Sequence, residues 1–160
     1  MSPKLRMLLF IALLFVLGVG GLVFAFGDQL GVLPRGEPRV VAFEQLDRDV
    51  GYVEVVGTAH YPVRVKQRFE PTWLRPDPPT IHIFPLFPKG DTMSREITVL
   101  VLSQVEPDRM LGLEDRAVRG EVQRPTSRVL TRGVLDTFRE HAYQFSDDFL
   151  LLIEDPPEAE

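Results

Sequence analysis

The sequence predicts a single N-terminal transmembrane helix followed by a mainly β (α+β) domain that contains one late helix. Three observations lead to this prediction. Residues 7–26 include no charged, proline or strongly polar residue. Most later apolar segments are short and rich in β-branched side chains, which favours strands. Only residues 125–142 combine a helix-start pattern with apolar residues at helical spacing.

The apolar run has the length of a membrane-spanning helix. Twenty residues at about 1.5 Å each cover roughly 30 Å, the thickness of a bilayer's hydrocarbon core. The run is apolar on all sides, so a core helix of a soluble protein is a poor alternative. A cleaved signal peptide is a further alternative, which would release a secreted binding domain. The best cleavage match, at 23–25, is weak and lies deep in the run, so we interpret residues 7–27 as an uncleaved signal anchor.

Charges beside this helix predict its orientation. Lys4 and Arg6 precede it and Asp28 follows it. Positive flanks stay on the cytoplasmic side. We therefore expect a single-pass protein of the cell membrane, with residues 1–6 in the cytoplasm and the C-terminal domain outside.

Small residues within the helix could pack against a second copy. Gly18 and Gly21 lie close together, and Gly21 forms a small-xxx-small pair with Ala25. Such pairs let two helices approach closely and would support a homodimer. Glycine is also common in transmembrane helices generally, and we favour this plainer interpretation.

Composition excludes several kinds of partner and chemistry. Of 18 basic residues, Lys4 and Arg6 precede the helix, which leaves 16 against 23 acidic residues and a formal charge near −7 for the external part. This charge argues against nucleic-acid binding. No cysteine is present, which rules out disulfides, thiol nucleophiles and cysteine metal ligands.

The remaining chain divides into a linker at 28–38, a domain at 39–155 and a polar tail at 156–160. Residues 40–43, 52–61, 63–69, 96–102, 116–122 and 149–153 are expected to form strands, with 96–102 central and buried on both faces. Residues 81–84, within a proline-rich stretch, are expected to add only a short edge strand. Helical turns are expected within 43–50 and 107–113, and a helix from 125–127 that buries Val134, Leu135, Phe138 and Ala142 on one face.

This order of elements suits a small, partly open β-barrel, and an OB-like barrel is the preferred version. Five short strands with Greek-key connections close such a barrel and leave few sheet edges. The residues expected to point inward are Val53, Val55, Val63, Val65, Val99, Val101, Leu150 and Leu152.

Catalytic and metal-binding patterns are weak. His60, His82 and His141 are far apart in sequence, and His82 is expected at the surface. The acidic pairs 114–115, 147–148 and 154–155 are interpreted as solvated ends of elements. We therefore expect no catalytic, metal or cofactor site and no cofactor. An enzyme with dispersed histidines and carboxylates is the alternative, and His60 or His141 beside a carboxylate in a deep pocket would support it.

Two features form the candidate interaction surface. Arg64, Lys66 and Arg68 share one face of the strand at 63–69, and Trp73 is the only tryptophan, in a proline-rich loop. The basic residues could receive an acidic partner or lipid headgroups, although a solvated face that protects the strand edge is the plainer interpretation. Trp73 could anchor a protein partner, contact the membrane interface, or plug the barrel. We interpret the protein as a non-enzymatic scaffold, assembly factor or accessory subunit with a protein partner at the membrane.

Overall fold

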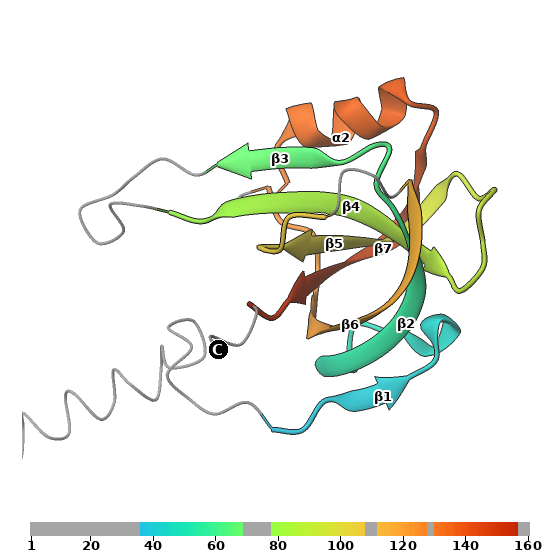
Figure 1. Cartoon of the computed structure of the whole chain (residues 1–160), viewed down its shortest axis with the longest axis vertical. Coiled ribbons are helices and arrows are strands. Elements are labelled where there is room, and N and C mark those ends of the chain that lie inside the picture. The colour runs from blue at the N-terminus through green and yellow to red at the C-terminus, as the bar shows by residue number, and fades with distance from the viewer. Residues whose placement is uncertain (1–35, 69–77, 108–111, 128–129, 157–160) are drawn as a thin grey trace, which may run out of the picture. The chain divides into compact units, whose positions relative to one another are not determined.

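The computed structural model describes residues 36–68, 78–107, 112–127 and 130–156. These residues are mainly β, with one α-helix (Figure 1). In chain order the elements are β1 (Arg39–Val41), the 3-10 helix η1 (Phe43–Gln45), β2 (Tyr52–His60), β3 (Val65–Arg68), β4 (Thr80–Pro88), β5 (Glu96–Ser103), β6 (Leu113–Gln123), α2 (Arg132–Glu140) and β7 (Gln144–Glu154).

Five strands close into a barrel. The sheet order is β1-β2-β6-β7-β5-β4-β3, and an additional antiparallel pairing of β2 with β4 joins the ring. Strands β2, β4 and β5 are successive antiparallel neighbours, and β6 returns to lie beside β2, which is a Greek key. Strands β5 and β7 are parallel. The barrel prediction is confirmed, but the ring is closed where a partly open one was expected.

Strand β4 corrects the prediction of a short edge strand at 81–84. It spans nine residues and pairs with β5 along one side. On its other side, residues 80–83 pair with β3 and residues 86–88 pair with β2. Pro85 therefore lies where β4 changes partner. Proline has no N–H to donate to a neighbouring strand. An internal strand can therefore contain Pro85 at the break between its pairing with β3 and its pairing with β2.

The barrel interior is one continuous apolar core. Strand β5 is central as predicted, since it lies between β4 and β7 and Val101 is fully buried. Phe43, Leu46 and Val50, in and after η1, pack against this core. The buried interior residues are Val41, Val53, Val55, Ala59, Tyr61, Phe84, Leu86, Val99, Val101, Val118, Val122, Leu150 and Leu152.

A second core lies between the outer face of the barrel and α2. Val134 and Phe138 of the helix belong to the same buried cluster as Leu100 of β5 and Leu151 of β7. The helix α2 lies on the outside of the barrel (Figure 1). Val63 and Val65 also belong to this outer core, so their assignment to the barrel interior is wrong. The predicted alternation is confirmed, because Val63 and Val65 lie on the same face of the chain and pack in the same core.

The late helix starts later than predicted. Its N-cap is Thr131, and it ends before His141. Val134 and Phe138 are buried as expected. Ala142 lies beyond the helix at a φ of 64° and is exposed, so its place on the buried face is wrong. The residue instead turns the chain from α2 into β7, which the helical spacing alone did not reveal.

Several predictions fall outside the described residues. They include the transmembrane helix at 7–27, its packing residues Gly18, Gly21 and Ala25, and the loop that holds Trp73. Within the described part of the chain, none of the helices is long and apolar enough to cross a bilayer.

Candidate functional site

The predicted basic residues lie beside one end of the barrel. Arg64 precedes β3 and its Nη1 donates a hydrogen bond of 3.4 Å to the carbonyl oxygen of Pro107. Lys66 is exposed, with its Nζ 3.9 Å from Oε1 of Glu106. Arg68, also exposed, ends β3. We call Arg64, Lys66 and Arg68 the basic row. Antiparallel pairing of β3 with β4 holds the row in an extended arrangement.

His82 lies directly opposite Lys66 in the β3–β4 pairing. It is only 3% exposed, so its predicted surface position is wrong. The reason is that β4 is internal and His82 lies on the same, barrel-facing side of this strand as Phe84. Its Nδ1 has no hydrogen-bond partner among the described residues. Burial lowers the pKa of His82; nearby Glu106 opposes this, whereas Lys66 and Arg64 reinforce it.

A polar network occupies the same end of the barrel. Tyr61 donates a hydrogen bond of 2.6 Å to Oε2 of Glu114, and Arg116 forms an ion pair with Glu154. Nη1 of Arg116 lies 3.4 Å from the Tyr61 hydroxyl. Burial, followed by the hydrogen bond to Glu114, raises the pKa of Tyr61 to about 12, although Arg116 lowers it in part.

The acidic pair at 147–148 is exposed, as the sequence predicted. The pairs at 114–115 and 154–155 were expected to be solvated too, but they have polar partners in the fold. Besides Glu114 and Glu154, Asp115 accepts a hydrogen bond from Thr58 and Asp155 accepts one from Tyr52. Each of these four carboxylates has a polar partner on β2, just after β2, or on β6. These carboxylates have structural roles at the barrel's surface and end.

His60 is buried in a structural setting. Its Nδ1 lies 3.2 Å from the Tyr143 hydroxyl and its Nε2 lies 3.0 Å from the carbonyl oxygen of Asp91. The ring also packs against Phe87, with centroids 4.3 Å apart. His141 is exposed, with Nδ1 2.8 Å from the carbonyl oxygen of Thr137. Among the described residues, the hydrogen-bond partners of both imidazoles are a hydroxyl and carbonyl oxygens, whereas a carboxylate partner in a deep pocket would have favoured the enzyme alternative.

No group of three or more potential metal ligands occurs within the described ranges. His60, His82 and His141 lie on β2, on β4 and just after α2, and the fold does not bring them to one point. The structure thus offers no donor set on which to build a metal centre in this part of the chain.

A groove opens at the opposite end of the barrel. Its volume is about 380 Å³, and its walls come from η1, the end of β4, the start of β5 and the first half of β7. We call this the acidic groove. It is lined by Phe43, Glu44, Leu46, Phe87, Pro88, Glu96, Thr98, Val99, Ser146, Asp148 and Leu150.

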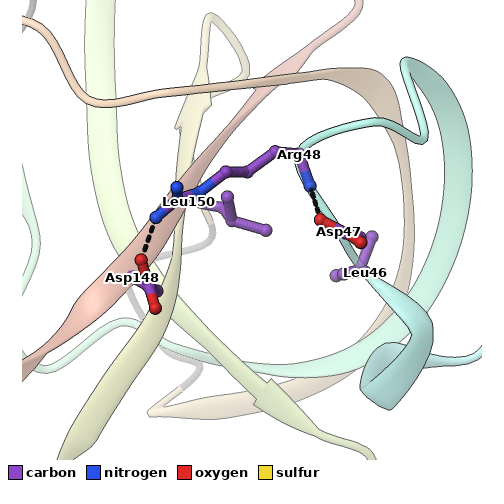
Figure 2. A pocket seen from close by; sticks show the side chains of 5 residues that line it. All are labelled: Leu46, Asp47, Arg48, Asp148 and Leu150. Carbon is purple, nitrogen blue, oxygen red and sulfur yellow. Dashed lines mark hydrogen bonds and ion pairs between the residues drawn. The ribbon is translucent and has the colours of Figure 1, made fainter.

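A smaller hollow of about 320 Å³ adjoins the acidic groove and shares three of its residues. Arg48 crosses this hollow and forms an ion pair with Asp148, while its backbone N–H donates to the carboxylate of Asp47 (Figure 2). Leu46 and Leu150 supply the apolar wall. Loop residues following η1 and residues of β7, about a hundred positions apart, thus meet at one side of the barrel end.

Sequence reasoning identified the basic row but not the acidic groove. The groove combines residues from four separate segments, and no local motif connects them. One signal was available, since Ser146, Asp147 and Asp148 place polar side chains within an otherwise apolar strand. That interruption marks where β7 leaves its regular pairing with β5.

Comparisons with protein-family models, with curated proteins and with solved structures give no match to this chain. Function must therefore be argued from the site itself.

Proposed function

We propose that this protein is a single-pass membrane protein whose external barrel acts as a scaffold, assembly factor or accessory subunit. In this proposal residues 7–27 anchor the chain and the barrel binds a protein partner at the membrane. The support for the anchor is the length and uniform apolarity of the run and its positive N-terminal flank. The support for partner binding comes from the position of the basic row.

We infer further that the barrel is OB-like. Counted along the chain, β2, β4, β5, β6 and β7 are the first to fifth strands of the ring. OB-folds bind ligands on the face of their second and third strands and through the loops between strands one and two and between strands four and five. Here α2 covers the face of β4 and β5. The loop between β2 and β4, residues 61–79, remains for binding, and it contains the basic row and Trp73.

The observation that carries the proposal is the position of Lys66 and Arg68 on β3, which pairs with β4, with Arg64 just before this strand. Three cations share one face there, although the external part of the chain carries a formal charge near −7. Such a row favours association with an acidic partner surface, since complementary charges raise the encounter rate and fix orientation. An aromatic anchor such as Trp73 would then supply affinity.

Charge removal tests the proposal. The triple change Arg64, Lys66 and Arg68→Ser in the full-length protein should reduce cross-linked partner recovery from native membranes. The loss should be greatest near 0.05 M salt and shrink near 0.3 M, where screening already weakens the wild type. Trp73→Ala should reduce recovery at both concentrations.

The matched control is the triple change Arg124, Arg132 and Arg139→Ser, which removes the same charge from exposed positions near or on α2. This variant should recover the same partners as the wild type. Equal recovery of partners by the basic-row variant and by this control would overturn the proposal. Thermal unfolding of each variant checks that a loss of recovery does not come from a loss of folding.

A further inference from the structure

The acidic groove lies apart from the basic row. The two surfaces adjoin opposite ends of β4: Lys66 pairs with His82 near its start, whereas Phe87 and Pro88 near its end line the groove. Phe87 lies five residue steps along the strand from His82, roughly 16 Å away. A ligand of the groove would therefore be independent of the partner proposed for the basic row.

The floor of the groove is apolar and its rim is acidic. Phe87, Val99 and Leu150 form buried parts of the wall, and Phe43 and Leu46 are partly buried against the barrel core. Glu44, Glu96 and Asp148 add three carboxylates, and none of the described lining residues is basic. A floor of this kind suits bulky apolar side chains, and the rim suits cations beside them.

The pairing of β5 with β7 is interrupted beside the groove. Ile97 pairs with Phe145, and the next pair is Val99 with Leu150, so residues 146–149 of β7 oppose Thr98 alone. Such a bulge disrupts the ladder and re-aims side chains. Ser146 and Asp148 of this bulge line the groove, so the bulge adds polar side chains to its wall.

Arg48, an arginine of the chain itself, already pairs with a carboxylate of the rim. Its guanidinium is paired with Asp148 across the adjoining hollow (Figure 2). Both side chains are solvent-accessible, Arg48 by 37% and Asp148 by 80%, so this pair is weakly held and exchangeable. An incoming arginine could take the same carboxylate if Arg48 moved aside.

We propose that the acidic groove docks a peptide segment of a protein partner in which arginine or lysine alternates with bulky apolar residues. The apolar side chains occupy the floor formed by Phe43, Phe87 and Leu150. The cations pair with Glu44, Glu96 and Asp148 at the rim. In the free protein Arg48 is paired with Asp148, so the peptide must displace it, and this competition lowers the affinity for the peptide.

The test uses the full-length protein in nanodiscs of phosphatidylcholine and three fluorescein-labelled peptides. The sequences are Gly-Leu-Arg-Leu-Arg-Gly, Gly-Ser-Arg-Ser-Arg-Gly and Gly-Leu-Glu-Leu-Glu-Gly. Fluorescence anisotropy at about 0.1 M salt should show the Leu/Arg peptide binding at least roughly tenfold more tightly than the other two. Empty nanodiscs report any binding to lipid.

Variants separate the two parts of the groove. Glu44→Gln, Glu96→Gln and Asp148→Asn together should weaken Leu/Arg binding about tenfold, and Arg48→Ala should tighten it a few-fold. Thr98→Trp should abolish it, because Thr98 is an exposed lining residue whose replacement fills the groove. The controls are Glu121→Gln, Asp136→Asn and Glu140→Gln together, and Thr92→Trp.

Equal affinity for the Leu/Arg and Ser/Arg peptides would show charge attraction alone and would overturn the proposal. The proposal also fails if Thr98→Trp binds as well as Thr92→Trp, or if binding to empty nanodiscs equals binding to the loaded ones. The basic-row variant keeps the groove intact, so it should bind the Leu/Arg peptide like the wild type. The proposals for the basic row and for the acidic groove can therefore be refuted independently.

Discussion

A β-carbon at Gly120 would overlap the carbonyl group of Ile153. Gly120 lies in β6 opposite Glu154 of β7, and Ile153 O is the nearest atom to the missing side chain. The backbone of β7 occupies this space and cannot rotate away as a side chain would. The glycine in this strand therefore permits a close approach of two main chains.

We predict that Gly120→Ala lowers the free energy of unfolding by about 3 kcal/mol or more, because β6 and β7 must separate to accommodate the methyl group. Urea unfolding followed by circular dichroism measures the loss. Gly57→Ala should behave similarly, since its β-carbon would lie 2.6 Å from the carbonyl oxygen of Phe87.

Gly133→Ala is the matched control. Gly133 lies in α2 with no atom within 4 Å of an added β-carbon. Alanine should stabilise the domain by about 0.5–1 kcal/mol through its higher helix propensity. Destabilisation by all three glycine variants to the same degree would contradict the close-approach explanation.

Truncation of Val101 tests the centre of the barrel. Val101 is fully buried and pairs with Phe84 on one side and Leu152 on the other. Val101→Ala should cost on the order of 1–3 kcal/mol, because the surrounding strands can close only part of the cavity. The same truncation at exposed Val40 is the control and should change stability by less than about 0.5 kcal/mol.

Regular patterns made the barrel predictable. The uninterrupted apolar run around Val99 and Val101 marks a strand buried on both faces, and the alternation from Val63 to Arg68 marks a half-buried one. These patterns follow from the two-residue period of a strand, which is visible in the sequence itself. They do not say which core a buried face joins, so they wrongly predict Val63 and Val65 inside the barrel.

Other features depend on tertiary partners. Pro85 is tolerated in an internal strand because β4 changes partner there, and His82 is buried because it shares the barrel side of β4 with Phe84. The acidic groove joins Phe43, Glu96 and Asp148, which only the closed fold brings together. The spacing of residues within one segment does not show which distant segments contact each other. The sequence therefore predicted the basic row, which lies in one segment, but not the acidic groove.

The orientation of the anchor has a direct test. The chain has no cysteine, so Ala159→Cys introduces a single thiol in the polar tail. An impermeant thiol reagent should label this position in intact cells if the barrel lies outside. Labelling only after lysis would contradict the orientation, and a shortened mature N-terminus by mass spectrometry would contradict the uncleaved anchor.

Tyr61 should make the domain sensitive to alkali. Its pKa is raised from 10.0 to about 12, so the native state holds its proton more tightly than the unfolded state. Stability from this group is complete below pH 10 and is lost as the pH rises toward 12, by roughly 2 kcal/mol. Urea unfolding across this range should show a shallower decline for Tyr61→Phe.

Glu114→Gln checks the cause of the Tyr61 shift. Removing the carboxylate takes away an interaction that raises the pKa, so the Tyr61 phenolate should form at lower pH. Ultraviolet absorbance of the native protein reports this directly. A titration in which all tyrosines ionise together near pH 10 would contradict the buried hydrogen bond.

His82 should make the domain sensitive to acid. Its pKa is lowered below 6.5 by burial, so the native state resists a proton that the unfolded state accepts. The stability that neutral His82 contributes is present above pH 6.5 and is lost as the pH falls below it. His82→Phe removes the titrating group and keeps an aromatic ring. Its free energy of unfolding should fall less than that of the wild type between neutral and mildly acidic pH.

The neighbours of His82 supply opposite controls. Lys66→Met removes a cation that lowers the pKa of His82, so acid sensitivity should decrease. Glu106→Gln removes an anion that raises it, so acid sensitivity should increase. Both variants keep His82 in place on β4, and urea midpoints across the acidic range compare them with the wild type. If both variants shift the acid transition in the same direction, or if His82→Phe unfolds in acid like the wild type, a group other than His82 controls it.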